Sequence, residues 1–155
     1  MIANNWDVAK NQIDNWKLSG YKIVFTNGCF DLLHRGHVDY LKDAKATGDK
    51  LIIALNSDNS VKNLKGSSRP IQNQKDRAVI LDALKSVDLI VIFDQETPME
   101  IIEKLIPDVL VKGGDYSIDK VIGADCVIEK GGEIKIIPFR PGYSTSSIIE
   151  KIIKV

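Results

Sequence analysis

The sequence predicts a doubly wound, Rossmann-like α/β fold: a five-stranded parallel sheet with helices on both faces, plus an N-terminal helix. Three observations lead to this prediction. Apolar segments of strand length alternate with segments of helical periodicity. Several strand segments are apolar throughout, such as Leu51–Leu55, which is typical of parallel strands buried on both faces. The 155 residues are enough for one domain with a sizeable core.

The first element is a helix over residues 2–18, where apolar side chains recur at helical spacing. We treat residues 1–20 as an N-terminal helical extension and residues 21–155 as the main domain. Trp6 and Trp16 lie on one stripe of this helix. We expect them to pack on their own domain; an assembly role against a second subunit is the alternative.

Five strands and five further helices follow in alternation. The strands are predicted at Lys22–Thr26, Leu51–Asn56, Leu89–Phe93, Val109–Lys112 and Glu133–Phe139. The helices are predicted from near Gly36, over Gln74–Val87, around Met99–Ile106, around Ile118–Glu129 and from Ser144 onwards. The segment Ser57–Asn73 has neither period and is predicted to be an irregular, basic loop.

Composition excludes several classes of protein. The chain has 21 basic and 21 acidic residues, so a general nucleic-acid-binding surface is not expected. No apolar run approaches the ~20 residues that span a bilayer, and no signal peptide is visible at the N-terminus. The two cysteines, Cys29 and Cys126, imply no disulfide framework. We therefore expect a cytoplasmic protein with no membrane partner.

Polar, glycine-rich or hydroxyl-rich segments follow four of the predicted strands. They begin at Thr26, Asn56, Lys112 and Arg140. Because ligands of open parallel sheets bind at the carboxyl ends of the strands, these segments predict one pocket on one edge of the sheet.

His34 and His37 stand where the first strand of the main domain leads into a helix. Residues three apart share a helix face, and each imidazole can offer an N–H to a phosphoryl oxygen. Gly36 allows a ligand to approach the backbone closely. For such a spacing, surface or core histidines are the commoner outcome, and a zinc site is a second alternative, although no partner pair has ligand spacing. The glycine-bearing strand-to-helix junction favours phosphate binding.

Other polar residues keep two interpretations each. Ser144-Thr145-Ser146 caps a helix, binds phosphate, or does both. Lys65, Arg69 and Arg77 are solvated charges or fold over a polyphosphate.

The acidic residues and the cysteine near these segments also keep alternatives. Asp31 binds magnesium through water, orients a histidine or caps a helix, and Asp115 accepts from a ribose or base or stabilises its turn. Cys29 is a packing residue rather than a nucleophile, because nothing nearby marks it as an activated thiolate.

Together these motifs resemble the cytidylyltransferase-like nucleotidyltransferase superfamily. The resemblance is carried by Gly28-Cys29-Phe30-Asp31, His34-Arg35-Gly36-His37 and Ser144-Thr145-Ser146. From Phe25 to Ile149 the chain is more narrowly similar to the adenylyltransferase domain of bacterial heptose kinase/adenylyltransferases. The segments that carry this narrower similarity are Thr26–Asp31, Asn56–Asp58, Leu64–Gly66, Ser68–Pro70, Val111–Tyr116 and Ser144–Ser146.

The resemblance implies transfer of AMP from ATP, with Mg²⁺, to D-glycero-β-D-manno-heptose 1-phosphate, giving ADP-heptose and pyrophosphate. It implies catalytic roles for His34, His37 and Lys65, and no metal site made by the protein itself. Residues implied in nucleotide binding are Asn27, Gly28, Cys29, Phe30, Gly36, Lys112, Gly113, Asp115, Ser144, Thr145 and Ser146. Residues implied in sugar-phosphate binding are Asp31, Asp58, Arg69 and Arg77.

The sugar-kinase domain that is usually fused upstream is absent from this sequence, so we expect a separate heptose kinase to supply the substrate. We also expect a homodimer or higher homo-oligomer. Two alternatives remain: another member of the superfamily, using CTP with a polyol or amine phosphate or ATP with FMN or a pantetheine phosphate, and a non-catalytic nucleotide-binding module.

Overall fold

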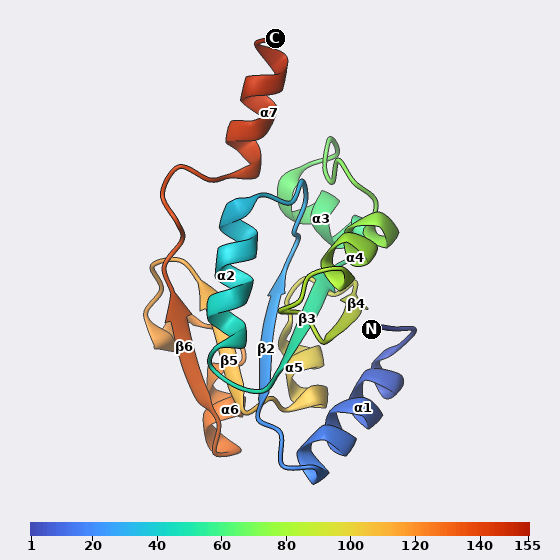
Figure 1. Ribbon diagram of the computed structural model, residues 1–155, viewed down its shortest axis with the longest axis vertical. Helices are drawn as coiled ribbons and strands as arrows, with labels where there is room; N and C mark the ends of the chain where they lie inside the picture. The colour runs from blue at the N-terminus through green and yellow to red at the C-terminus, as the bar shows by residue number, and fades with distance from the viewer.

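One sheet of six parallel strands forms the centre of the molecule, in the order β1-β4-β3-β2-β5-β6 (Figure 1). The computed structural model describes all residues, 1–155. The strands are β1 Ile2–Ala3, β2 Ile23–Gly28, β3 Lys50–Asn56, β4 Leu89–Phe93, β5 Val109–Gly113 and β6 Glu133–Ile137. The doubly wound parallel sheet predicted from the sequence is confirmed.

The predicted count of five strands is wrong, because β1 adds a sixth strand beside β4. Ile2 pairs with Ile90 and Ala3 with Val91. A strand of two residues shows no alternation, and Ile2 also fitted the helical spacing of the segment that follows it. The helix predicted over residues 2–18 therefore begins later, at Trp6, where the Asn5 side chain accepts a hydrogen bond from the Val8 N–H.

Seven α-helices accompany the sheet. They are α1 Trp6–Leu18, α2 Arg35–Lys45, α3 Asp58–Lys65, α4 Gln74–Asp82, α5 Met99–Leu105, α6 Ala124–Glu129 and α7 Thr145–Ile153.

Helix α4 ends at Asp82 rather than at the predicted Val87, and two other helical segments also differ from the prediction. The expected loop 57–73 contains α3, which Ser57 caps by accepting the Ser60 N–H at 3.0 Å; only Ser60 and Val61 of α3 are buried, so the sequence shows little apolar period. The helix expected at 118–129 is divided into a single 3₁₀ turn, Ile118–Lys120, and helix α6, which begins after Gly123 with its φ of +85°.

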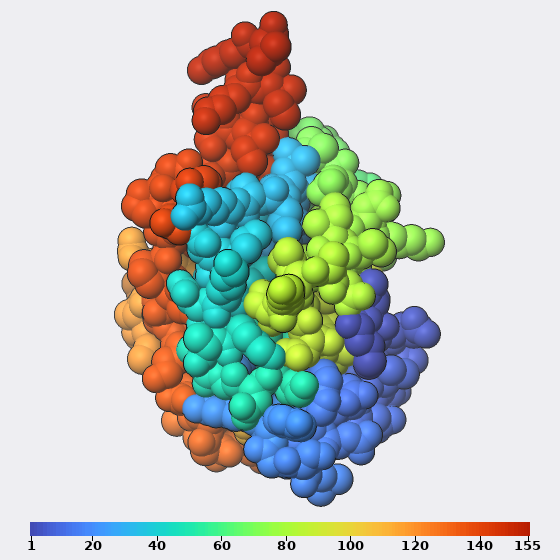
Figure 2. Space-filling model, viewed as in Figure 1, coloured from blue at the N-terminus to red at the C-terminus, as the bar shows by residue number.

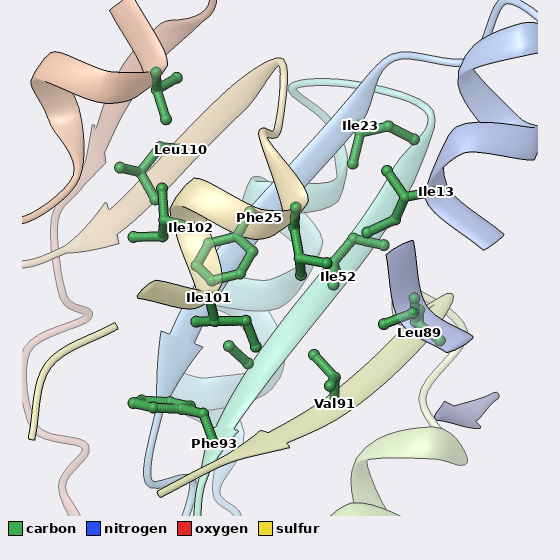
Figure 3. Close-up of a cluster of buried hydrophobic side chains, with 14 of the residues drawn as sticks. Ile13, Ile23, Phe25, Ile52, Leu89, Val91, Phe93, Ile101, Ile102 and Leu110 are labelled. Atoms are coloured by element: carbon green, nitrogen blue, oxygen red, sulfur yellow. The ribbon is translucent and has the colours of Figure 1, made fainter. Parts of the chain in front are cut away.

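Two apolar clusters cover the two faces of the sheet. Along β2, Ile23 and Phe25 face one cluster and Val24 faces the other. Helices α1, α5 and α6 supply side chains to the first cluster, which Figure 3 shows around Phe25 and Ile52. Helices α2 and α4 close the second. Burial on both faces explains why the central strands are apolar throughout.

The first twenty residues join this same sheet and core. Trp6 and Trp16 pack against the first cluster, and the Trp6 Nε1–H donates to the Ile92 carbonyl at 2.9 Å. The expectation that the two tryptophans pack on their own domain is therefore confirmed. None of the helices has both the length and the apolar character required to cross a membrane.

The order of the strands fixes where a ligand site belongs. From β2 the chain builds outward through β3 to β4, and it then returns to place β5 and β6 on the other side of β2. The carboxyl ends of β2 and β5 therefore flank the topological switch point, where doubly wound sheets bind their ligands. Helix α7 stands out from the body just beyond this edge (Figures 1 and 2), and none of its residues is buried.

Candidate functional site

A cavity of about 700 Å³ opens at the carboxyl edge of the sheet. All the predicted site residues line it except Asp58, Arg77 and Asp115. Those that line it are Asn27, Gly28, Cys29, Phe30, Asp31, His34, Gly36, His37, Lys65, Arg69, Lys112, Gly113, Ser144, Thr145 and Ser146. The four strand ends singled out in the sequence thus meet at one place.

His34 and His37 lie stacked at the start of α2. Their ring centroids are 3.8 Å apart with an interplanar angle of 18°. The backbone N–H of His34 donates to His37 Nδ1 at 3.4 Å, so the ring proton of neutral His37 is on Nε2. His34 Nδ1 is buried and has no hydrogen-bond partner in the protein. His34 Nδ1 is thus enclosed at the start of α2, and the His37 Nε2–H is a ring donor left for a bound group.

Burial disfavours the protonated form of both imidazoles. Burial lowers the pKa of His37 from 6.5 to about 4, and the nearby His34 and Lys65 lower it further than Asp31 raises it. Burial also lowers the pKa of His34. The unliganded site thus presents polar N–H groups rather than fixed imidazolium charges.

Lysines supply positive charge on two sides of the cavity. Lys65 is the last residue of α3, where Gly66 adopts a φ of +95° and turns the chain. Lys112 lies near the end of β5, and burial lowers the pKa of its ammonium group. Neither lysine forms an ion pair within the protein, so both are available to an anionic ligand.

Asp31 holds the segment that follows α3, which includes Arg69, close to the carboxyl end of β2. Its carboxylate accepts hydrogen bonds from Arg69 Nε at 2.7 Å and from the backbone N–H groups of Ile71 and Gln72 at 2.8 and 3.0 Å. Burial opposes ionisation of Asp31, but these bonds outweigh it and hold its pKa below the usual range. Arg69 Nη2 is buried without a partner and is therefore poised for a ligand oxygen.

The turn around Asp31 is strained. Phe30 and Leu32 have φ of +46° and +49°, a region that residues other than glycine seldom adopt. The Asp31 carbonyl accepts a hydrogen bond from Thr145 Oγ1 at 2.7 Å, which joins this turn to the start of α7. The strain is concentrated beside the histidines, as is common at functional sites.

The serine-rich segment has a capping role within the protein. Ser144 Oγ accepts the Ser147 N–H at 3.1 Å and so caps α7. Ser146 and the remaining free N–H groups of the first turn still face the cavity edge. Capping and anion binding are therefore compatible here.

Three predicted residues do not reach the cavity. The Arg77 side chain is fully buried, and its donors are used by the protein: Nη1 donates to the Cys29 and Asn56 carbonyls at 2.6 and 2.9 Å, and Nη2 to Asp58 Oδ1 at 2.8 Å. Asp115 is exposed outside the lining. Arg77 and Asp58 hold the ends of β2 and β3 in place, and contact of either residue with substrate stays a prediction.

The comparison with family models decides the family of the chain. The cytidylyltransferase-like model matches residues 25–151. The chain belongs to the cytidylyltransferase-like family.

This cytidylyltransferase-like domain has many curated relatives. It is 58% identical over 90% of its length to the Bifunctional protein HldE of Marinomonas sp. (strain MWYL1). The corresponding values for the Bifunctional protein HldE of Magnetococcus marinus are 51% and 96%. In both cases the match covers 30% of the relative, so the chain spans about 30% of the length of these curated relatives.

Solved structures support the fold of the cytidylyltransferase-like domain. The lipopolysaccharide core biosynthesis protein from Thermoplasma volcanium GSS1 is 28% identical with a TM-score of 0.63, covering 78% of this chain and 98% of the other. A pantoate-beta-alanine ligase from Francisella tularensis, complexed with beta-gamma ATP and beta-alanine, has a TM-score of 0.62 at 16% identity and covers 100% of this chain and 78% of its own. At that identity the second likeness shows the fold alone.

Several cavity residues of the cytidylyltransferase-like domain were not predicted. Glu96, Thr97 and Pro98 follow β4, and the rule that found the other strand ends applies to this one too. Tyr40 lines the cavity from α2, with its hydroxyl 2.6 Å from Thr26 Oγ1; burial raises the pKa of Tyr40 to about 12. A tyrosine at a helical core position carries no separate functional signal.

Aromatic rings also border the cavity near the ends of β5 and β6. They belong to Tyr116, Phe139 and Tyr143. Phe139 is 67% exposed, and it lies so close to Gly113 that a Cβ there would meet its ring at 2.5 Å. Glycine is therefore required for this close packing.

Proposed function

We propose that this domain transfers AMP from ATP to a sugar 1-phosphate, D-glycero-β-D-manno-heptose 1-phosphate, releasing ADP-heptose and pyrophosphate. Membership of the cytidylyltransferase-like family supports nucleotidyl transfer. The motif resemblance to heptose adenylyltransferases and the identity of 58% to a Bifunctional protein HldE support this choice of donor and acceptor.

The proposed chemistry is a direct in-line displacement. An oxygen of the acceptor phosphate attacks the α-phosphorus of ATP, and the bond from that phosphorus to the pyrophosphate oxygen breaks. Because the acceptor phosphate is already ionised at neutral pH, no strong general base is required. Catalysis then depends on positioning and on stabilising the charge that develops on the phosphoryl oxygens.

The stacked pair of His34 and His37 is the observation that carries this proposal. A neutral imidazole held at a helix N-terminus, with its Nδ1 already accepting a backbone hydrogen bond, directs its Nε2–H outward. We assign His37 to the α-phosphoryl oxygens and His34 to the neighbouring phosphates. The leaving pyrophosphate is assigned to the start of α7, where the Ser144 and Ser146 hydroxyls and the Thr145 backbone N–H are the donors.

Lys65 and Arg69 are assigned to the acceptor phosphate. Lys65 carries an unpaired charge at the cavity, and Arg69 keeps a buried, unpartnered Nη2 while Asp31 fixes its Nε. A guanidinium that is anchored at one nitrogen offers the other in a fixed direction, which favours recognition of a phosphate.

Magnesium is assigned to the substrate rather than to a protein cage. No group of three or more His, Cys, Asp or Glu side chains in the chain has the geometry to hold a metal ion. Mg²⁺ commonly binds through substrate phosphates and a few waters, which fits this cavity. The ion then enters with ATP and neutralises part of the phosphate charge.

Several features of the biological context stay predictions. The relatives are named bifunctional and are longer than this chain, so the kinase that supplies the heptose phosphate, separate or fused, is to be established. The homodimer or higher homo-oligomer and the cytoplasmic location are likewise predictions, which size-exclusion chromatography with light scattering and cell fractionation would test.

Pyrophosphate release measures the proposed reaction. ATP, CTP and GTP are each incubated with heptose 1-phosphate, glycerol phosphate, ethanolamine phosphate, FMN and pantetheine phosphate. We expect turnover with ATP and heptose 1-phosphate; turnover with another pair identifies a different member of the family. Nucleotide binding without turnover in any pair contradicts the proposal and identifies a binding module.

The His37→Ala variant tests the assigned role within the same assay. We expect its rate to fall by about 100- to 1000-fold with unchanged thermal stability, because a transition-state donor is lost. Near-normal turnover by His37→Ala contradicts the assignment of His37 to the α-phosphoryl oxygens, even if the wild-type reaction is the expected one.

A further inference from the structure

The cavity extends beyond the switch point to the end of β4. There Glu96 and Thr97 line it, together with Pro98, which begins the segment leading into α5. The proposed transfer of AMP assigns no role to these residues. They lie on the β3–β4 side of the sheet, whereas β2 and β5 flank the switch point at which a doubly wound sheet binds its nucleotide.

The charges around the cavity single out Glu96. Four lining side chains are cationic: Lys65, Arg69, Lys112 and Arg140. Two are carboxylates, and the first of them, Asp31, is paired with Arg69 and shielded by two backbone donors.

The second carboxylate that lines the cavity belongs to Glu96. It forms no ion pair and no hydrogen bond with any other residue. A free carboxylate repels phosphate, so a ligand group that fits Glu96 is one other than phosphate.

The segment that carries Glu96 is fixed at several points. Ser57 Oγ donates to Asp94 Oδ1, and Ser60 Oγ donates to the Gln95 carbonyl at 3.3 Å. Pro98 is buried and its carbonyl accepts the Ile102 N–H at 3.0 Å. These contacts fix the backbone on both sides of Glu96, whose own side chain is exposed at the cavity rim.

Lys65 and Arg69, which are assigned to the acceptor phosphate, follow β3, the neighbour of β4, so we expect the rest of the acceptor on the Glu96 side of the cavity. Sugar hydroxyls are hydrogen-bond donors, and an ionised carboxylate accepts such bonds more strongly than a neutral group does. Asn56 and Thr97, which line the same region, add further polar partners.

We propose that Glu96, with Thr97 beside it, binds hydroxyl groups of the acceptor and so selects a polyhydroxylated sugar phosphate over a bare or apolar phosphate. This proposal rests on the proposed function, because it names the part of that site that reads the acceptor. It assigns Glu96 to specificity and leaves ATP binding to the other end of the cavity.

The test compares two acceptors in two variants. Heptose 1-phosphate and methyl phosphate share the phosphate group, but only the first has hydroxyls. We expect Glu96→Gln to raise the KM for heptose 1-phosphate by about 10- to 100-fold, the effect of losing a hydrogen bond to a charged group. The KM for ATP should be unchanged, and the rate with methyl phosphate should be unchanged or higher because a repelling charge is gone.

Glu100→Gln is the matched control. Glu100 lies in the first turn of α5, is exposed and does not line the cavity, so the same charge change there should have no effect on either acceptor. Thr97→Val, which replaces a hydroxyl by a methyl group of similar size, should raise the KM for heptose 1-phosphate in the same direction as Glu96→Gln but by a smaller factor.

Several outcomes overturn the proposal. They are an unchanged KM for heptose 1-phosphate in Glu96→Gln, an equal loss with both acceptors, and a shift in the Mg²⁺ requirement with an unchanged acceptor KM, which would make Glu96 a metal ligand. If the wild type shows no turnover, the proposed function fails. Calorimetric binding of the two phosphates, in the presence of an α,β-methylene analogue of ATP, then decides the role of Glu96 alone.

Discussion

Replacing Arg77 by methionine should destabilise the protein strongly, although the Arg77 side chain does not itself line the cavity. Its guanidinium makes four hydrogen bonds: to the Cys29, Asn56 and Gln72 carbonyls and to the Asp58 carboxylate, at 2.6 to 3.0 Å. The side chain is 0% exposed, so water cannot replace its donors without rearrangement.

The expected loss follows from these contacts. Three carbonyls lose a charged donor, and Asp58, which is 30% exposed, loses its partner but keeps some water. Breaking such a buried pair costs about 3–5 kcal/mol, a large part of the ~5–15 kcal/mol that stabilises a typical domain. Urea unfolding followed by tryptophan fluorescence measures the loss.

The Arg77→Lys variant keeps the assay informative if Arg77→Met does not fold. Lysine retains the charge but cannot reproduce the forked set of donors, so we expect about half of the loss together with reduced turnover. Turnover falls because the Cys29 and Asn56 carbonyls mark the ends of the two strands that border the site. A loss below about 1 kcal/mol in both variants would refute the reasoning, since it would mean that water satisfies these carbonyls.

Three further outcomes are expected. Because burial lowers the pKa of His37 from 6.5 to about 4, the unfolded chain takes up this proton first, and stability should fall as the pH drops from about 6.5 to 4; urea midpoints should show a shallower fall for His37→Gln. Gly36→Ala places a Cβ 2.9 Å from the Tyr143 Cβ, so turnover should fall at least about tenfold with little change in melting temperature. Trp6→Phe removes the hydrogen bond to the Ile92 carbonyl and should cost about 1 kcal/mol in urea unfolding.

The sheet could be predicted because its strands are long apolar runs, while the elements that were missed carry weaker signals. The edge strand β1 has two residues, and its pairing with β4 depends on contacts more than 80 positions apart. Helix α3 buries only Ser60 and Val61, so local capping by Ser57 and contact with β3 decide its formation. Such tertiary contacts leave little trace in a local pattern.

The site could be predicted in part because polar residues at strand ends have one geometric consequence: they converge on one edge. The same rule does not distinguish a residue whose side chain lines the cavity from one whose side chain supports the strand ends behind it. Arg77 and Arg69 both follow β3 in the chain, but Asn73 caps α4 and brings Arg77 under the strand ends, whereas Asp31 holds Arg69 at the cavity. The distinction depends on which hydrogen-bond acceptors lie near each arginine in the folded structure, and a local sequence pattern does not contain that information.

The chain has no net charge, and two of its lysines that lack a carboxylate partner, Lys65 and Lys112, line the cavity. Surface lysines such as Lys10 and Lys22 are paired with carboxylates, whereas Lys65 and Lys112 at the cavity have none. Burial depresses the pKa values of Lys112 and His37, so the protein disfavours positive charge there until an anion arrives. Bound phosphate reverses that penalty, and the interaction strengthens with the negative charge on the phosphoryl oxygens. A site built in this way favours the state in which the transferred phosphoryl group carries most charge, which is the condition for catalysis rather than for binding alone.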